Sequence, residues 1–193
     1  STMAITYAPS TSYRNTDGTL KNPRMPFIIQ TVSEITKRDG LTTEANRTRY
    51  AYEAGHFYAE EGVFSENRFT GFGKITETDT DGNKTVRYFH QGGGFNGSAI
   101  GEFEDHIDKR GRPYREEFYD SSGAKKREIV YTWRRSELAG SDTSGDTRLT
   151  RAFLWASDVR ETSHDGAPKS KMISKNYDLA TGNLIEEIEW GEV

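Results

Sequence analysis

Residues 119–133, YDSSGAKKREIVYTW, join a glycine-centred turn to a run in which every second residue is apolar. Ile129, Tyr131 and Trp133 fall on one face of an extended chain, because successive side chains of a β-strand point to opposite faces. Gly123 stands where a tight turn needs the left-handed backbone that costs glycine least. The stretch therefore predicts a turn that leads into a half-buried strand.

The same alternation recurs in residues 47–52, 84–90 and 183–190, which are rich in aromatic and β-branched side chains. In the last of these runs, Leu184, Ile188 and Trp190 are expected to share one face of a strand. Residues 42–62 fit a helix about as well as strands, so both alternatives stay open there. The chain as a whole is predicted to be mainly β.

Turns are predicted at five glycines, most of which have an Asp or Asn beside them: Gly40, Gly82, Gly123, Gly166 and Gly182. The first four lie 42, 41 and 43 residues apart, and the fifth follows after only 16. A nearly constant spacing of this length is typical of a repeat architecture. We therefore expect an antiparallel sheet of successive hairpins, either open or spiralling.

Composition limits the classes of protein to consider. The 193 residues suit one domain of the usual size and are enough to bury a core. With 30 acidic and 26 basic residues and no long run of one sign, a nucleic-acid partner has little electrostatic support. No apolar run is long enough to span a bilayer, and no signal-peptide pattern is present. The absence of cysteine excludes disulfides and thiolate metal sites.

The chain is expected to have two parts. Residues 1–25, which contain two prolines, are predicted to form an extended lead-in, and residues 26–193 a β-sheet region. Ser1 and Thr2 before Met3 are interpreted as a cloning remnant, so the chain is expected to be an excised fragment of a larger protein.

Few residue patterns predict chemistry. Four scattered histidines (His56, His90, His106 and His164) lack the spacing of a zinc site. The acidic residues of EFEDHID (102–108), among them Glu102 and Glu104, could bind a hard cation or act in glycoside hydrolysis, or simply form a solvated strand edge. We expect no catalytic residue, no metal and no cofactor, and hence no enzyme.

ETDTDG (77–82) places Glu77, Asp79, Asp81 and Gly82 at the first, third, fifth and sixth positions of a calcium-binding loop. Tyr88 then stands at the twelfth position, where such a loop needs a bidentate glutamate. The pattern therefore favours a hairpin turn, and weak calcium binding at Glu77–Gly82 is left open.

Two stretches, residues 119–133 and NYDLATGNLIEEIEW (176–190), resemble the Tyr-Asp repeats of bacterial Rhs proteins, which also occur in teneurins and in the B subunits of insecticidal toxin complexes. Residues 49–93, followed by GRPYREEFYDSSG (111–123), resemble the middle region of those B subunits, just upstream of the regular repeats. The family-like motif within it comprises Phe69, Gly71, Phe72 and Gly73. The resemblance covers residues 26–133, and the repeats carry it to the end.

This resemblance implies a segment of a hollow shell that encloses a C-terminal toxic or signalling cargo, secreted or displayed on the cell surface as part of a larger bacterial protein. The implied partners are the rest of that polypeptide, its cargo and other toxin-complex subunits. Six residues would serve structural roles in the repeats: Tyr119, Asp120, Gly123, Tyr177, Asp178 and Gly182. The family's Asp-Pro self-cleavage motif does not occur, so the resemblance implies no autoproteolytic residue.

A second hypothesis is a surface adhesin or a carbohydrate-binding β module. Its candidate stacking residues are Trp133, Trp155, Trp190 and Tyr88. A binding module would have to present several of these rings in one solvated groove. If the final hairpin is instead one unit of a repeat, the last strand lacks a partner and is a predicted site of edge-to-edge homodimerisation.

Overall fold

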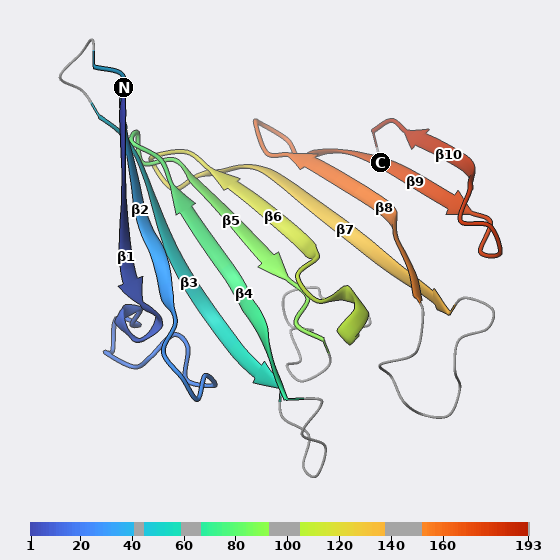
Figure 1. The fold of residues 1–193 in the computed structure, drawn as a ribbon. Helices are drawn as coiled ribbons and strands as arrows, with labels where there is room; N and C mark the ends of the chain where they lie inside the picture. The colour runs from blue at the N-terminus through green and yellow to red at the C-terminus, as the bar shows by residue number, and fades with distance from the viewer. Residues whose placement is uncertain (41–44, 59–66, 93–104, 138–151, 193) are drawn as a thin grey trace.

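Ten antiparallel strands form one sheet in the computed structural model, and they follow one another across the sheet in chain order (Figure 1). The structure describes residues 1–40, 45–58, 67–92, 105–137 and 152–192. The strands are β1 (Thr2–Pro9), β2 (Gln30–Arg38), β3 (Asn46–Tyr58), β4 (Arg68–Thr78), β5 (Lys84–Phe89), β6 (Pro113–Tyr119), β7 (Lys125–Glu137), β8 (Ala152–Ser163), β9 (Lys169–Tyr177) and β10 (Leu184–Trp190). Two short 3₁₀ helices, η1 (Ser10–Ser12) and η4 (Ile107–Lys109), complete the described elements. The prediction of a mainly β antiparallel sheet is confirmed.

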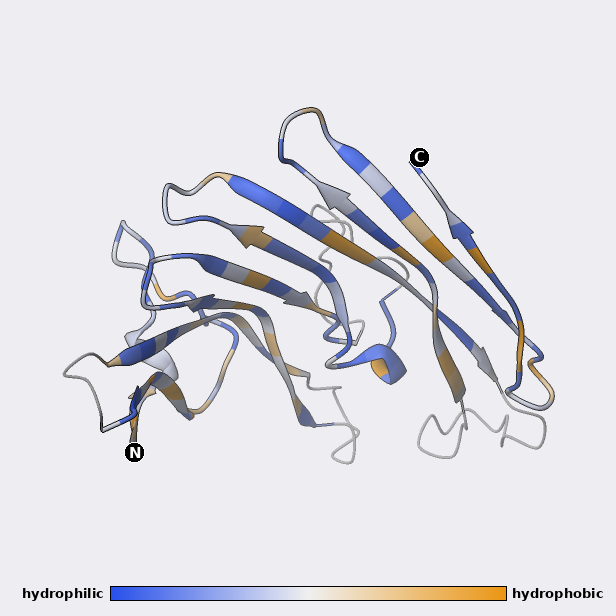
Figure 2. Ribbon diagram, turned by 90° about the horizontal axis from the view of Figure 1, so that it is seen from above, coloured by the Kyte–Doolittle hydropathy of each residue, from blue (hydrophilic) through white to orange (hydrophobic). Residues whose placement is uncertain are grey.

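The sheet is a single curved layer. Seen from above, its strands follow an arc, and no second layer of the described chain faces them (Figure 2). Only Val86 and Tyr114 are buried apolar side chains among the described residues. The accessible surface is 11985 Å², against about 9,300 Å² for a compact monomer of this mass. The described residues thus bury a smaller core than a chain of this length could, because alternating apolar residues are buried only where another layer covers them.

The glycine spacing follows from the topology. Three of the turns lie at the same ends of the strands, the upper ends in Figure 1: Gly82 turns β4 into β5, Gly123 turns β6 into β7, and Gly166 turns β8 into β9. Each of these glycines has a φ of 85° to 88°. Two strands separate consecutive turns, so the interval of roughly 42 residues is one up-and-down pair of strands. Gly182, with a φ of 75°, turns β9 into β10 at the opposite ends of the strands, one strand after the Gly166 turn, which explains its shorter interval.

Two local expectations are settled by the strand pairing. Helix and strand were both open for residues 42–62, and residues 46–58 of this range form strand β3. In β10 a register shift leaves Ile185 unpaired, so that Leu184 lies opposite Tyr177, while Ile188 and Trp190 lie opposite Ser174 and Met172. Tyr177 and Ser174 belong to opposite faces of β9, so the expectation that Leu184 shares a face with Ile188 and Trp190 is wrong.

The first residues of the chain belong to the sheet, since β1 pairs with β2 from Thr2 opposite Arg38 to Pro9 opposite Gln30. The following segment returns to β3, where Asn22 Nδ2 donates a hydrogen bond of 3.0 Å to the Tyr52 carbonyl. The division at residues 25 and 26 stays a prediction. No helix in the described ranges combines the length and the apolar character needed to cross a bilayer.

Candidate functional site

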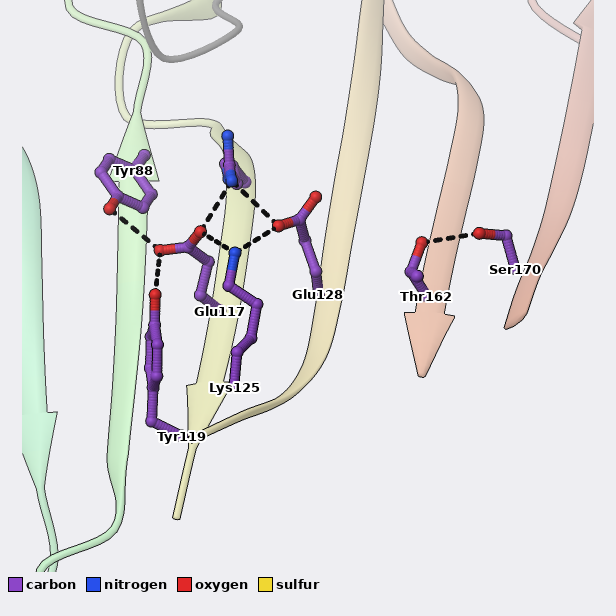
Figure 3. Close-up of polar contacts among 8 residues, drawn as sticks. Tyr88, Glu117, Tyr119, Lys125, Glu128, Thr162 and Ser170 are labelled. Carbon is purple, nitrogen blue, oxygen red and sulfur yellow. Dashed lines mark hydrogen bonds and ion pairs between the residues drawn. The ribbon is translucent and has the colours of Figure 1, made fainter. Parts of the chain in front are cut away.

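Two glutamates face each other on neighbouring strands, because Glu117 of β6 pairs in register with Glu128 of β7. Like charges so placed destabilise a sheet. Arg115 offsets the repulsion, since its Nη2 lies 2.7 Å from Glu117 Oε1 and 2.9 Å from Glu128 Oε2. Lys125 Nζ makes the same two contacts at 2.7 and 2.9 Å. These four side chains form a neutral group, here called the Glu117 cluster (Figure 3).

Two tyrosine hydroxyls attach to this cluster. Tyr88 of β5 and Tyr119 of β6 each donate a hydrogen bond of 3.0 Å to Glu117 Oε2 (Figure 3). Glu117 is only 4% exposed. Burial raises the pKa of the Glu117 carboxyl, but hydrogen bonds from Lys125 and Tyr119 and the charge of Arg115 outweigh burial and lower this pKa to about 2. Burial, followed by the Glu117 charge, raises the pKa of Tyr88.

Such a carboxylate is poorly suited to proton transfer at neutral pH, because a general base works best with a pKa near the operating pH. Both of its oxygens are already engaged, Oε1 by Arg115 and Lys125 and Oε2 by Tyr88 and Tyr119. The Glu117 cluster and the Tyr88 hydroxyl thus tie β5, β6 and β7 together.

The preceding residue builds a second cluster on the opposite face of the sheet. Glu116 Oε2 lies 3.1 Å from Arg87 Nε, and Arg87 Nη1 lies 3.0 Å from Glu77 Oε2. The Tyr131 hydroxyl donates a hydrogen bond of 3.0 Å to Glu116 Oε1. Burial, followed by the charge of Glu116, raises the pKa of Tyr131 to about 12. This second cluster links β4, β5, β6 and β7.

Asp120 organises the turn between β6 and β7. Its Oδ1 accepts hydrogen bonds from the backbone N–H groups of Ser122 (2.9 Å) and Ala124 (3.0 Å). Its own carbonyl accepts from the N–H of Gly123 at 2.9 Å. The hydrogen bond from the Ser122 side chain, together with those from the backbone, lowers the pKa of Asp120. An acceptor at the start of the turn thus holds the backbone that Gly123 completes.

A carboxylate at the start of the turn accepts backbone N–H groups in two other turns as well. Asp79 Oδ1 accepts from the N–H groups of Asp81 and Asn83, each at 2.9 Å. Asp178 Oδ1 accepts from the N–H of Ala180 at 2.9 Å. In a turn that sequence reasoning missed, the N–H of Gly18 donates to the Asn15 carbonyl at 2.9 Å. The signal available for it was an Asn three residues before a glycine, the spacing that also separates Asp79 from Gly82 and Asp120 from Gly123.

The tyrosines of the two Tyr-Asp pairs make different contacts. Tyr177 packs across to β8, with its ring centroid 5.5 Å from that of Phe153 and 6.3 Å from that of Trp155. The Tyr119 hydroxyl instead donates a hydrogen bond to Glu117 of its own strand, and the centre of its ring lies 5.9 Å from Lys125 Nζ. Tyr177 thus contacts the neighbouring strand β8, and the Tyr119 ring contacts Lys125 of the neighbouring strand β7.

The family-like motif lies in β4. The Gln91 side chain lies against the two glycines of this motif, Gly71 and Gly73. Its Nε2 donates hydrogen bonds to the carbonyls of Ala54 (2.7 Å) and Gly71 (2.9 Å). A Cβ at Gly73 would lie 2.8 Å from Gln91 Oε1, and Gly71 has a φ of 94°. The glycine at position 73 therefore leaves room for the Gln91 side chain, and the glycine at position 71 permits a backbone with positive φ.

The phenylalanines of the motif belong to a row of aromatic contacts. Ring centroids lie 5.9 Å apart for Phe27 and Phe69, 5.5 Å for Phe69 and Phe72, 4.9 Å for Phe72 and Tyr52, and 5.7 Å for Tyr52 and Tyr13. Edge-to-face and tilted arrangements of this kind are favourable. The row docks the segment between β1 and β2 onto β3 and β4.

An open groove of about 580 Å³ lies where that segment meets β3 to β6. Glu53 at its wall lies 3.0 Å from Lys21 Nζ and 3.1 Å from Lys74 Nζ. Tyr88 lines this groove. The other three rings named for carbohydrate stacking, Trp133, Trp155 and Trp190, lie on β7, β8 and β10. The four candidate stacking residues are therefore spread over four strands.

The acidic stretch 102–108 is only partly described, because Glu102 and Glu104 lie outside the described residues. Asp105 Oδ1 lies 3.0 Å from His90 Nδ1, and Oδ2 accepts from the N–H of Gly92 at 2.8 Å. Asp108 pairs with Arg135. These carboxylates are engaged in local contacts.

The calcium-like stretch forms the β4–β5 turn. The Asp79 carboxylate accepts three hydrogen bonds from Asp81 and Asn83, and Glu77 pairs with Arg87. Within the described parts of the chain, no group of three or more His, Asp or Glu side chains is placed to hold a metal ion.

Sequence reasoning missed the side chains that tie the strands together, notably Arg115, Lys125, Glu128 and Gln91. The available signal was weak: Arg115 and Glu117 alternate within YREEFY, as residues on one strand face do. Their partners depend on the register of the neighbouring strands.

Two comparisons with known proteins found a match, one with a protein family and one with a solved structure. Residues 1–90 match the family model described as insecticide toxin TcdB middle/N-terminal region. The solved structure titled "Crystal Structure of TcdB2-TccC3-TEV" has a similar fold, with a TM-score of 0.75 and 14% sequence identity over 97% of this chain and 11% of that chain. The present chain thus spans about a tenth of that protein. A search of curated proteins found no match. The chain resembles the middle region of the B subunits of insecticidal toxin complexes, in sequence over its first 90 residues and in fold over nearly its whole length.

Proposed function

We propose that this chain is a non-catalytic structural segment of an Rhs-type toxin shell that encapsulates a C-terminal toxic or signalling cargo. The observation that carries the proposal is the single curved sheet of ten strands in chain order (Figure 2). A sheet of this kind can be continued by further strands at either edge and can curve around an interior. The partners would be the remainder of a longer, secreted bacterial polypeptide, its cargo and other toxin-complex subunits.

The polar clusters support this role. A single-layer wall lacks an opposing layer to pack against, so its strands must be held by contacts within the sheet. The Glu117 cluster and the Glu116–Arg87 pair provide such contacts on both faces of β5 and β6. The similarity to TcdB2-TccC3-TEV supports the same role through the fold.

Protease protection tests the proposal. The complete polypeptide that contains this sequence would be digested with trypsin, and its C-terminal cargo should resist digestion while the isolated cargo is degraded. Val86→Asp should abolish protection, because it buries a charge directly opposite Glu117. Lys171→Ala, at a side chain that is 66% exposed, is the matched control and should leave protection unchanged. Cargo that is cleaved in the unmodified polypeptide as fast as in isolation would show that encapsulation is wrong.

A further inference from the structure

The segment between β1 and β2, residues 10–29 and here called the strap, is docked on β3 by hydrogen bonds from the strand's backbone. Three N–H groups of β3 donate to it: Ala54 to the Lys21 carbonyl (3.0 Å), Gly55 to Asn22 Oδ1 (2.8 Å) and Phe57 to the Arg24 carbonyl (3.3 Å). Each of these N–H groups is protected from exchange with water only while the strap is in place. They therefore report directly on its docking.

His56 lies among these donors and is only 8% exposed. The Thr70 hydroxyl donates a hydrogen bond of 3.0 Å to the His56 carbonyl. Since a hydroxyl has a single proton, this group can only accept from the imidazole ring, whose Nδ1 lies 3.2 Å away. The neutral ring thus carries its proton on Nδ1, and acidification adds a second proton, with a positive charge, at Nε2.

Cations outnumber anions around this ring. The groove that His56 lines carries Lys21 and Arg24 of the strap and Lys74 of β4, and Glu53 is its single carboxylate among the described residues. Glu53 is already shared by the two lysines, at 3.0 and 3.1 Å. The other titratable side chains that line the groove are two tyrosines, Tyr88 and Tyr114. A charge on His56 would therefore add to an existing excess of positive charge.

Asp105 is the acidic group that favours a charged His56. Its carboxylate is engaged elsewhere, since Oδ1 lies 3.0 Å from His90 Nδ1 and Oδ2 accepts from the N–H of Gly92 at 2.8 Å. Burial, followed by the charge of Arg24, outweighs Asp105 and lowers the pKa of His56. The environment of the ring thus favours its neutral form.

We propose that His56 makes the docking of the strap sensitive to acid, so that adding a proton to its ring loosens residues 21–24 from β3. The charges that the strap contributes to the groove, Lys21 and Arg24, are both positive and would be repelled by the protonated ring. The pKa of His56 lies below its ordinary value of 6.5 while the strap is docked. Docking is therefore at full strength above about pH 6.5 and weakens as the pH falls below that value.

Hydrogen exchange followed by NMR tests this inference. Protection of the Ala54 and Phe57 N–H groups, relative to the intrinsic exchange rate at the same pH, should fall several-fold between about pH 7.5 and about pH 5.5. The N–H of Asp120, which donates to the Ala124 carbonyl in the β6–β7 turn, should keep its protection. Equal protection of Ala54 and Phe57 at the two pH values would overturn the proposal, and this comparison needs no variant.

Three variants identify the group responsible. His56→Asn retains a donor for the Thr70 hydroxyl but does not titrate, so protection in this variant should be independent of pH. Arg24→Gln removes one cation of the strap and should reduce the loss of protection. His164→Gln, in the turn between β8 and β9, is the matched control and should respond to acid as the unmodified chain does.

The neighbouring pair of His90 and Asp105 is the competing source of an acid response. A loss of protection that persists in His56→Asn would assign the response to that pair and would overturn the role of His56.

Discussion

The hydroxyl of Tyr88 on β5 donates a hydrogen bond of 3.0 Å to the carboxylate of Glu117 on β6. The two strands are separated along the chain by residues 90–112, so this contact depends on how the sheet is assembled. Glu117 is buried although the sheet has no second layer in the described residues, because cations and hydroxyls on three strands surround it. Polar contacts within the sheet thus stabilise it, as apolar packing between layers stabilises a layered domain.

Replacing Glu117 tests that role. Glu117→Gln keeps the size of the side chain but leaves Arg115 and Lys125 with only Glu128 as an acidic partner in the cluster. The free energy of unfolding at pH 7 should fall by roughly 1 to 3 kcal/mol, as for a charged group that loses a buried partner. Urea denaturation followed by circular dichroism measures this change. Glu161→Gln, which removes ion pairs at the surface of β8, should cost less than about 1 kcal/mol.

The effect of Glu117 on stability should depend on pH. The pKa of its carboxyl is about 2 in the folded chain and ordinarily 4.5, so the folded state favours the anion. The stabilisation is therefore fully present above pH 4.5 and is lost as the pH falls towards 2. The difference in unfolding free energy between the unmodified chain and Glu117→Gln should shrink over this range. A difference that stays constant from pH 7 to pH 2 would contradict the assignment.

Gly123→Ala should destabilise the β6–β7 turn. Nothing lies within 4 Å of the added methyl group, so the cost comes from the φ of 86°, and a left-handed conformation costs a non-glycine residue about 1 to 2 kcal/mol. Gly191 also has open space around it but no positive φ, so Gly191→Ala is the control and should change stability by less than about 0.5 kcal/mol. Equal effects of the two substitutions on the thermal midpoint would exclude backbone strain as the cause.

Gly73→Ala should act through Gln91. The new methyl group would lie 2.8 Å from Gln91 Oε1 and would displace the amide that bonds to the Ala54 and Gly71 carbonyls. The loss should be roughly 1 to 3 kcal/mol. In a Gln91→Ala background the same substitution should cost much less, because the obstructing side chain is gone. A double-mutant cycle measures the coupling, and additive effects would show that the two positions act independently.

Small-angle X-ray scattering should report an extended particle. A compact chain of this length has a radius of gyration near 16 Å, and a single-layer sheet should exceed it. A value at or below about 16 Å would mean that the sheet closes on itself.

The sequence by itself predicted several of the strands and most of the turns. Period-two alternation in residues 127–133 and glycine at residues 82, 123 and 166 act through local backbone geometry, which needs no knowledge of distant partners. The spacing of those glycines also predicted the repeat. The pairing of Glu117 with Glu128, the approach of Gln91 to Gly73 and the face of Leu184 could not be predicted in this way.

Only the tertiary structure decided these features, because each depends on strand register. A shift of one residue would move Glu117 away from Glu128 and turn its side chain to the other face. Nor could alternation show whether a second layer covers the apolar face, since the pattern is the same for a covered and an open sheet. The strands thus follow from local sequence, whereas the single layer and its polar clusters follow from which strands meet and in which register.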